Sequence, residues 1–392
     1  MVSRRSFLVG SGAVVCGSLL AGCSNAANAA FSVRLLNQSL PRQLINQFRS
    51  QLAKGKAVSF TPDSKIADIF QYLETWQEKA TGDKSDEESR FRLPFIGQQT
   101  PTPASLVSLG DAWLETAIAQ NLIQPLNLDT LEEWSSLPPR WQTLVKRNKK
   151  GFVDDSGQTW GAPYRWGTTM IVYNKQALKK LDWFPQDWDD LWDERLRDRI
   201  SVIDQPREII GLTLKKLGYS YNKGTLSDIP DLEQELKSLA QNIKFANSNT
   251  YLQPLLLKDT WVAVGWSSDI LPILDNYPQL EALVPPAGTA LWSDVWVQPA
   301  IANNTTPLLA DWINFCWQEK SALTISLFTD GIAPRLVTPQ RSTLPNDVQN
   351  QPLKFPAPDI LDKSEFLYPI APSTQTEYTQ LWQTMFASGH NA

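Results

Sequence analysis

Tryptophans and carboxylates recur close together where short apolar strands are expected to end. Trp266 closes one such strand, and Asp269 follows three residues later. Trp292 and Asp294 stand two residues apart in another strand, a spacing that places both side chains on one face. Glu208 lies in the first turn of the helix expected after a third strand. Aromatic rings attract ammonium groups and carboxylates accept their N–H bonds, so this set has the chemistry to bind an organic cation.

Spacing alone does not separate a ligand site from ordinary packing, because most of the 16 tryptophans are expected in the core. Trp296 continues the alternation of Trp292 and Asp294 and is expected on their face. Trp166 follows a loop and is a further candidate contact. Its neighbour Arg165 is an awkward companion for a cationic ligand. If Arg165 points into a cleft, it pairs with a carboxylate and weakens the case for a polycationic ligand.

The elements that position these residues alternate between strand and helix, as in an α/β sheet covered by helices. Strands are expected at 31–36, 58–60, 105–110, 200–203, 261–266 and 292–301, and helices at 41–52, 63–76, 113–118, 206–217, 307–318, 321–329 and in the tail to about 387. Residues 161–175 are expected to begin as a loop and become a strand from Thr169 to Tyr173. We expect this strand and 292–301 to cross between two lobes, with the ligand where they cross.

The amino terminus predicts export. Arg4 and Arg5 stand in a Ser-Arg-Arg-x-Phe-Leu context, which is typical of the twin-arginine route. The apolar segment that follows is short for a transmembrane helix and suits a signal peptide. It ends in Leu20-Ala-Gly-Cys23, which resembles a bacterial lipobox, so we expect a signal at 1–22, a lipid on Cys23 and a tether at 23–30. The alternative is an ordinary signal peptide cleaved after Ala30.

Composition excludes several function classes. The net charge is −5 and there is no basic tract, which argues against a nucleic-acid partner. The single histidine, His390, is almost at the carboxyl end, so no histidine triad or histidine metal cluster is expected in the folded body. Cys316 is the one cysteine outside the amino-terminal signal and lipid site, and its helical stripe predicts a core residue. Neither a metal nor a cofactor is expected.

Seven motifs carry a resemblance to a known family: Ala162-Pro-Tyr-Arg-Trp-Gly-Thr-Thr169 with Tyr173-Asn-Lys175, Trp188-Asp-Asp-Leu-Trp192, Asp204-Gln-Pro-Arg-Glu208, Lys216-Leu-Gly-Tyr219, Gly265-Trp-Ser-Ser-Asp269, Leu291-Trp-Ser-Asp294 and Asp330-Gly-Ile-Ala-Pro334. Together they resemble the periplasmic polyamine (spermidine/putrescine) binding proteins of bacterial ABC importers, from about residue 100 to residue 335. By that resemblance Glu208, Trp266, Asp269, Trp292 and Asp294 match ligand-contact positions.

The first lobe departs from the pattern of this family. The family motif Asn-Trp-[Ser/Thr]-[Asp/Glu]-Tyr after the first strand is replaced by Leu35-Leu-Asn-Gln-Ser39. The family motif Pro-Ser-x-x-Phe/Tyr is replaced by Leu109-Gly-Asp-Ala-Trp113, and Gln205 stands where relatives have an acidic residue. One wall of the pocket is therefore retained and the other changed. The candidates for the changed wall are Asn37, Ser39, Asp111 and Trp113.

The resemblance implies a two-lobed α/β periplasmic-binding-protein fold of type II, with mixed sheets flanked by helices and a ligand cleft between the lobes. We expect lobe 1 to hold residues 31–163 and about 295–342, and lobe 2 to hold 164–294 and about 343–392. The implied function is that of a substrate-binding lipoprotein. It captures a small cationic amine, such as putrescine or spermidine, by hinge closure and delivers it to a membrane permease. A monomer is expected, with membrane contact through its lipid anchor.

Three alternatives stay open. The same fold can take another small solute. The chain can also be a non-transporting lipoprotein that uses the fold for protein contacts. An enzyme would need a carboxylate pair such as Glu208 and Asp294 as acid and base. We do not expect an enzyme, because a usable histidine, a reactive cysteine environment and a phosphate-binding loop are all missing from the sequence.

Overall fold

A single mixed sheet runs through both halves of the molecule and carries the strands that cross between them. Its order is β2-β1-β3-β12-β7-β10-β8-β9, while β11 pairs with β7, and β4 and β13 pair with β12. The strands are β1 (Phe31–Leu36), β2 (Val58–Asp63), β3 (Leu106–Gly110), β4 (Ile123–Gln124), β7 (Ala162–Asn174), β8 (Ile200–Val202), β9 (Ile243–Ala246), β10 (Val262–Trp266), β11 (Leu280–Leu283), β12 (Ala290–Pro299) and β13 (Glu365–Phe366). A separate hairpin joins β5 (Lys146–Arg147) to β6 (Gln158–Thr159).

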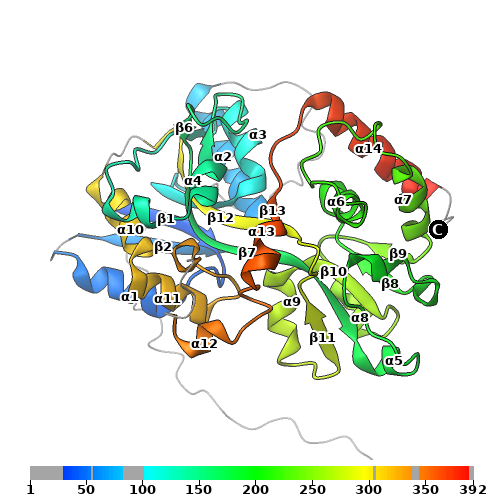
Figure 1. Cartoon of the computed structure of the whole chain (residues 1–392). Helices are drawn as coiled ribbons and strands as arrows, with labels where there is room; N and C mark the ends of the chain where they lie inside the picture. The colour runs from blue at the N-terminus through cyan, green and yellow to red at the C-terminus, as the bar shows by residue number, and fades with distance from the viewer. Residues whose placement is uncertain (1–29, 54–55, 83–100, 303–305, 338–343, 388–392) are drawn as a thin grey trace, which may run out of the picture.

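Helices cover this sheet in both halves (Figure 1). They are α1 (Arg42–Gln51), α2 (Ile66–Thr81), α3 (Leu114–Ala119), α4 (Pro139–Val145), α5 (Lys175–Lys179), α6 (Pro206–Lys216), α7 (Leu232–Ala240), α8 (Leu252–Leu256), α9 (Ser267–Leu274), α10 (Pro307–Trp317), α11 (Glu319–Phe328), α12 (Asn346–Gln349), α13 (Pro358–Lys363) and α14 (Pro372–Ala387). The expected α/β class is confirmed.

The computed structural model describes residues 30–53, 56–82, 101–302, 306–337 and 344–387. The signal peptide, the twin arginines, Cys23 and all of the tether except residue 30 therefore lie outside the described residues. No helix in the described ranges is long and apolar enough to span a bilayer.

β7 is the longer of the two crossing strands, with 13 residues that are all buried. Its first half pairs with β12 and its second half pairs with β10 and β11. The prediction that this stretch begins as a loop is therefore wrong, because β12 supplies the partner that a lone sequence segment does not reveal. Pro163 fits within the strand because the register with β12 shifts there, and irregularities of this kind tolerate proline.

Buried apolar side chains form two clusters, which we call the cores of lobe 1 and lobe 2. The lobe 1 core takes residues from 31 to 166 and from 291 to 366. The lobe 2 core takes residues from 170 to 290, together with Tyr378 and Met385 of α14. After about residue 343, which was expected to begin the last part of lobe 2, Val348, Phe355 and Leu361 lie in the lobe 1 core, whereas Leu353, Ile360 and Leu367 pack against the lobe 2 core. We propose that the lobe boundaries follow these two cores.

Local sequence signals explain two helices that matter below. In α10 the Thr306 side chain accepts a hydrogen bond from the Leu308 backbone N–H, and Cys316 is buried in the core, as predicted. In α6 the cap is Gln205, because proline at the next position fixes where the helix begins. Gly218 has a φ of 80° just beyond the end of α6, the left-handed conformation that commonly ends a helix and favours glycine.

Candidate ligand-binding site

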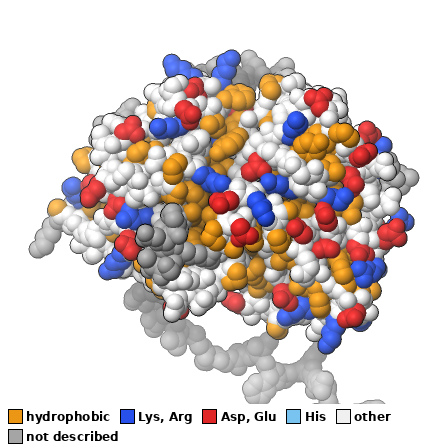
Figure 2. All heavy atoms as spheres, in the orientation of Figure 1, with side chains coloured by type: hydrophobic (Ala, Val, Ile, Leu, Met, Phe, Trp, Pro, Cys, Tyr) orange, Lys and Arg blue, Asp and Glu red, His pale blue; other side chains and the backbone are white. Residues whose placement is uncertain are grey.

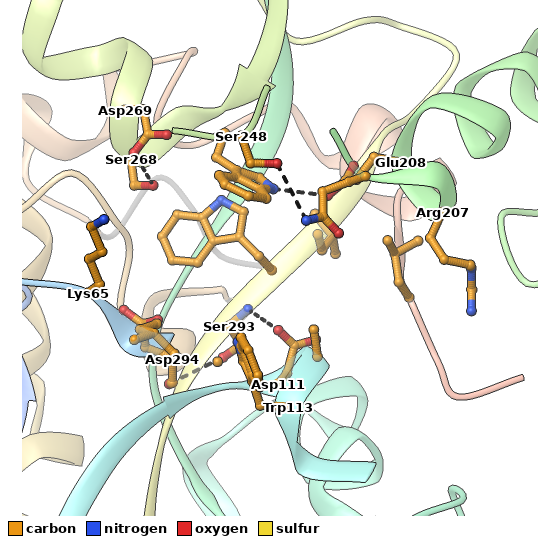
Figure 3. Close-up of a pocket in the computed structure, with 18 of the residues that line it drawn as sticks. Lys65, Asp111, Trp113, Arg207, Glu208, Ser248, Ser268, Asp269, Ser293 and Asp294 are labelled. Carbon is orange, nitrogen blue, oxygen red and sulfur yellow. Dashed lines mark hydrogen bonds between the residues drawn. The ribbon is translucent and has the colours of Figure 1, made fainter. Parts of the chain in front are cut away.

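A cavity of about 670 Å³ lies between the two lobes. The lobe 1 wall comes from the end of β3, the short 3-10 helix Asp111–Trp113 after it, and β12. The lobe 2 wall comes from the start of α6, the end of β10, the start of α9 and the loop after β9. Figure 3 shows Asp111, Trp113 and Asp294 on one side of this space, with Glu208 and Asp269 on the other.

The structure brings together seven of the eight predicted contact residues around this cavity. They are Asp111, Trp113, Glu208, Trp266, Asp269, Trp292 and Asp294. Leu36 reaches the cavity from the first strand, but the candidates Asn37 and Ser39 do not line it. The role of the seven lining residues as ligand contacts stays a prediction, because convergence on one cavity does not by itself show what is bound.

Trp166 is the eighth predicted residue, and the structure places it elsewhere. It is fully buried in the lobe 1 core, where its ring packs against Trp141 and Phe355. Arg165 precedes it on β7 and lines the cavity, and successive strand residues point to opposite faces. Trp296 is likewise buried: it stacks on Tyr164, because β12 has by then run past the cleft into lobe 1.

Glu208 is the central carboxylate of the lobe 2 wall. It is buried, and its two oxygens accept hydrogen bonds from Trp266 Nε1 at 3.0 Å and from Thr169 Oγ1 at 2.8 Å. Burial raises the pKa of Glu208, although these two bonds act in the opposite direction. The first turn of α6 thus presents a carboxyl group whose partners in the protein are both neutral.

Asp269, in the first turn of α9, is the other carboxylate of the lobe 2 wall. Its carboxylate accepts a hydrogen bond from the Tyr251 hydroxyl at 3.1 Å, and burial raises the pKa of Asp269. Gly265 at the end of β10 permits this arrangement, because a Cβ there would overlap the Tyr251 ring. Sequence reasoning missed Tyr251; the signal was its place in the loop after β9, at the same sheet edge as the other lining loops.

The lobe 1 wall carries a buried ion pair. Arg165 and Asp294 face each other across β7 and β12. Arg165 Nε and Nη2 both donate to Asp294 Oδ2, at 2.8 and 2.6 Å. Burial alone would lower the pKa of Arg165, but the charge of Asp294 raises it overall, so the guanidinium remains a cation. Its central carbon also lies 5.4 Å from the centre of the Trp292 ring.

The ring of Trp292 lies against the backbone of β7 at Gly167, where the absence of a side chain leaves room for it. A Cβ at Gly167 would overlap the indole of Trp292 and the hydroxyl oxygen of Ser267. The close approach of the ring to the β7 backbone therefore requires glycine at this position.

Asp111 and Arg147 form the second charged group of the same wall. Asp111 accepts the backbone N–H of Ser293 at 2.9 Å. Burial raises the pKa of Asp111 to about 7, while this bond and the charge of Arg147 oppose the rise. Arg147 is buried, donates to the carbonyls of Leu144 and Gly151, and has its pKa lowered to about 10 by burial. The sequence did not single out Arg147, which lies within a run of charged residues.

Charge around the cavity is nearly balanced. Among the described residues, five acidic and four basic side chains line it: Asp111, Glu115, Glu208, Asp269 and Asp294, with Lys65, Arg147, Arg165 and Arg207. Arg207 points away from the centre in Figure 3 and donates to the Tyr368 carbonyl at 2.9 Å. The outer surface mixes the two signs as well, since Figure 2 shows acidic and basic side chains interspersed over the visible face.

Two lobes, two crossing strands and a cleft lined from both sides define a periplasmic binding protein of the two-lobed type II class. The family model described as bacterial extracellular solute-binding protein matches residues 101–364, and the chain belongs to this family. It is a family of solute-binding proteins and not of enzymes.

Relatives with curated functions point to amines. A putrescine/cadaverine-binding protein of Pseudomonas aeruginosa is 34% identical over 127 residues, which is 31% of this chain and 36% of the relative. A spermidine/putrescine-binding periplasmic protein of Salmonella typhimurium is 26% identical over 247 residues, or 63% of this chain and 67% of the relative. The chain thus aligns with about a third of the first relative and two thirds of the second.

Solved structures show the fold. The spermidine/putrescine ABC transporter substrate-binding protein from Streptococcus pneumoniae superposes with a TM-score of 0.72 at 20% identity. The superposition covers 91% of this chain and 98% of that protein.

Proposed function

We propose that this chain is the substrate-binding protein of an ABC importer and that it captures a small aliphatic amine of the polyamine class. The observation that carries the proposal is the cleft, where Glu208, Asp269 and Trp266 on the lobe 2 wall are joined by Trp292 on the lobe 1 wall. Carboxylates without a basic partner accept ammonium N–H bonds, and the rings hold the methylene chain. The amine-binding relatives support the same class of ligand.

The expected affinity follows from the chemistry of these contacts. A desolvated cation–π contact contributes about 1–2 kcal/mol, and a hydrogen bond to a charged group about 1.5–3 kcal/mol. Two of each sum to about 5–10 kcal/mol before the entropy lost on association is subtracted, so we expect binding no tighter than roughly micromolar, or about −8 kcal/mol. An anion would be repelled by the two carboxylates, so the proposal excludes anionic solutes.

Capture proceeds by closure of the lobes. Because the two walls belong to different cores, a ligand that contacts both walls binds the closed state better than the open one. β7 and β12 are the strands about which closure takes place. The closed monomer then delivers the amine unchanged to a permease in the inner membrane.

We further propose that the mature protein is periplasmic and anchored to a membrane by a lipid on Cys23 after twin-arginine export. Arg4, Arg5 and the lipobox ending at Cys23 support this, and one of the relatives named above is described as a periplasmic protein. Labelled palmitate is expected to be incorporated into the wild-type chain and not into Cys23→Ala. Equal incorporation into both chains, or none into wild type, would contradict the lipid on Cys23.

Calorimetry tests the ligand class. A soluble chain that begins at Ser24 is titrated with putrescine, cadaverine, spermidine and single-amine analogues of the same length. We expect at least one amine to bind near the micromolar range and to raise the melting temperature. Glu208→Gln is the site control and is expected to weaken that binding. Absence of both heat and thermal shift for every amine would refute the proposed function.

A further inference from the structure

Asp294 and Trp292 together have the chemistry of an ammonium subsite, but a side chain of the protein already fills it. The Arg165 guanidinium donates twice to Asp294 Oδ2 and lies over the Trp292 ring. We propose that Arg165 acts as a built-in substitute for one ligand ammonium. The cleft then selects an aliphatic amine with a single ammonium group and an uncharged, hydrogen-bond-accepting far end. This inference rests on the proposed function and specifies its ligand.

Arg165 is held in this position from two sides. It pairs directly with Asp294 across the two central strands of the sheet, and both side chains are 5% exposed. On its other side the chain runs close by at Gly331, where a Cβ would overlap the Arg165 side chain. Trp166 and Ile332 exchange two backbone hydrogen bonds of 2.9 Å, which fixes that approach. The guanidinium is therefore part of the wall and does not swing aside for a ligand.

The distribution of charge agrees with a single cationic group. Asp294 is compensated by Arg165, and Asp111 lies close enough to Arg147 to feel its charge. No ion pair within the described residues engages Glu208 or Asp269. The charges of Arg207 and Arg165 act on these two carboxylates, but neither arginine forms an ion pair with them. A second ammonium would meet the guanidinium of Arg165 across the cleft and be repelled.

The far end of the ligand meets a donor and not an acceptor. A guanidinium has five N–H groups, and the bonds to Asp294 come from Nε and Nη2. A carbonyl or hydroxyl oxygen on the ligand can accept a hydrogen bond from the N–H groups of Arg165 that do not bond to Asp294. An amine whose second nitrogen is acylated has this form: one ammonium, a methylene chain and a neutral amide oxygen.

The test compares two probes with the same four-carbon chain, putrescine and N-acetylputrescine, on wild type and on Arg165→Met. Wild type is expected to bind N-acetylputrescine at least tenfold more tightly than putrescine. Arg165→Met opens the subsite of Asp294 and Trp292, so it is expected to gain putrescine affinity and reverse the ratio. Arg34→Met is the matched control: Arg34 forms an ion pair with Asp63 in lobe 1 but does not line the cavity, and the ratio of this variant should match wild type.

A double variant, Arg165→Met with Asp294→Asn, separates the subsite from a general loss of positive charge. It should lose the gain in putrescine affinity, because the carboxylate is gone. Wild type that binds putrescine as tightly as N-acetylputrescine overturns the inference, and this comparison holds even where a variant fails to fold. An unchanged ratio in folded Arg165→Met overturns it too. Wild type that binds no amine at all refutes the proposed function instead.

Discussion

The two walls of the cleft treat their carboxylates in opposite ways. On the lobe 2 wall Glu208 and Asp269 accept hydrogen bonds from neutral donors, and no ion pair within the described residues engages either of them. On the lobe 1 wall Asp294 is locked in an ion pair with Arg165. A carboxylate that the protein itself compensates contributes to structure, whereas one with only neutral partners is available to a cationic ligand. The walls therefore divide the work of holding the lobe together and of recognising the solute.

Among the variants that test this difference between the walls, Asp294→Asn is expected to have the largest effect, a loss of folding stability. This variant leaves Arg165 buried without its counter-ion, a change that costs about 3–5 kcal/mol of folding stability. Urea unfolding of the soluble chain measures this loss. The double variant Arg165→Met with Asp294→Asn removes both charges and should recover most of it. A loss below about 1 kcal/mol in the single variant, a value typical of an exposed pair, would show that the pair is not structural.

Glu208→Gln should have the opposite profile, with a loss of affinity and no loss of stability. Removing the charge takes away a charged hydrogen bond of about 1.5–3 kcal/mol, or roughly ten- to hundredfold in the dissociation constant. Stability should stay or rise, because burial raises the pKa of Glu208 and so disfavours its ionised form. Calorimetry and thermal melts measure the two quantities. Glu115→Gln, on the other wall, is the matched control and should change affinity less than about threefold.

A smaller effect is expected from pH, through Asp111. Its pKa in the fold is about 7, so the unliganded fold holds a proton there that the unfolded chain has already lost. Stability from this group is therefore highest at low pH and falls as pH rises towards and through about 7. Amine affinity should move the other way and rise by at most about tenfold per pH unit as the carboxylate ionises. Titrations from pH 5.5 to 8.5 test this, and Asp111→Asn should flatten the profile.

The smallest effect is expected for Lys65→Ala. Lys65 lines the cavity from the lobe 1 side, but it is exposed and forms no ion pair with the described residues. A screened surface charge changes affinity by less than about threefold, and the change should vanish in high salt. A larger effect, or one that persists in 0.5 M salt, would mean that Lys65 belongs to the closed ligand site.

Most of the fold was predictable because its elements have clear local signals. β1, β10 and α10 lie within a residue or two of their expected limits, since apolar runs, a proline and a capping threonine mark them. The start of β7 was not predictable, because its strand conformation depends on β12, more than a hundred residues away. The packing of Val348, Phe355 and Leu361 in the lobe 1 core was not predictable for the same reason. It depends on contacts with residues far away in the sequence, which the local sequence pattern does not indicate.

The residues of the candidate site were predictable where the end of a strand positions them. They were not predictable where the direction of the side chain depends on distant contacts. Trp266 and Asp269 reach the cavity because β10 ends there and α9 begins. Trp166 was predicted as a ligand contact because a loop was expected around it. The structure has a strand there instead, and side chains of neighbouring strand residues point to opposite faces, so Trp166 points away from the cavity that Arg165 lines. Arg147 reaches the cavity through the β5–β6 hairpin, for which the sequence offers no strong signal.

The position of β12 has a consequence for the order in which the chain acquires structure. β12 lies between β3 and β7, so the sheet of lobe 1 lacks its connecting strand until residue 299 has been made. The strands of lobe 2, by contrast, lie in one uninterrupted run from the second half of β7 to β11. During synthesis the strands of lobe 2 can therefore pair first. The sheet of lobe 1 forms later, because it depends on contacts between residues far apart in the sequence, and such contacts form slowly. The sheet of the amino-terminal lobe is therefore completed after that of lobe 2, although the lobe 2 core still lacks α14 at that point.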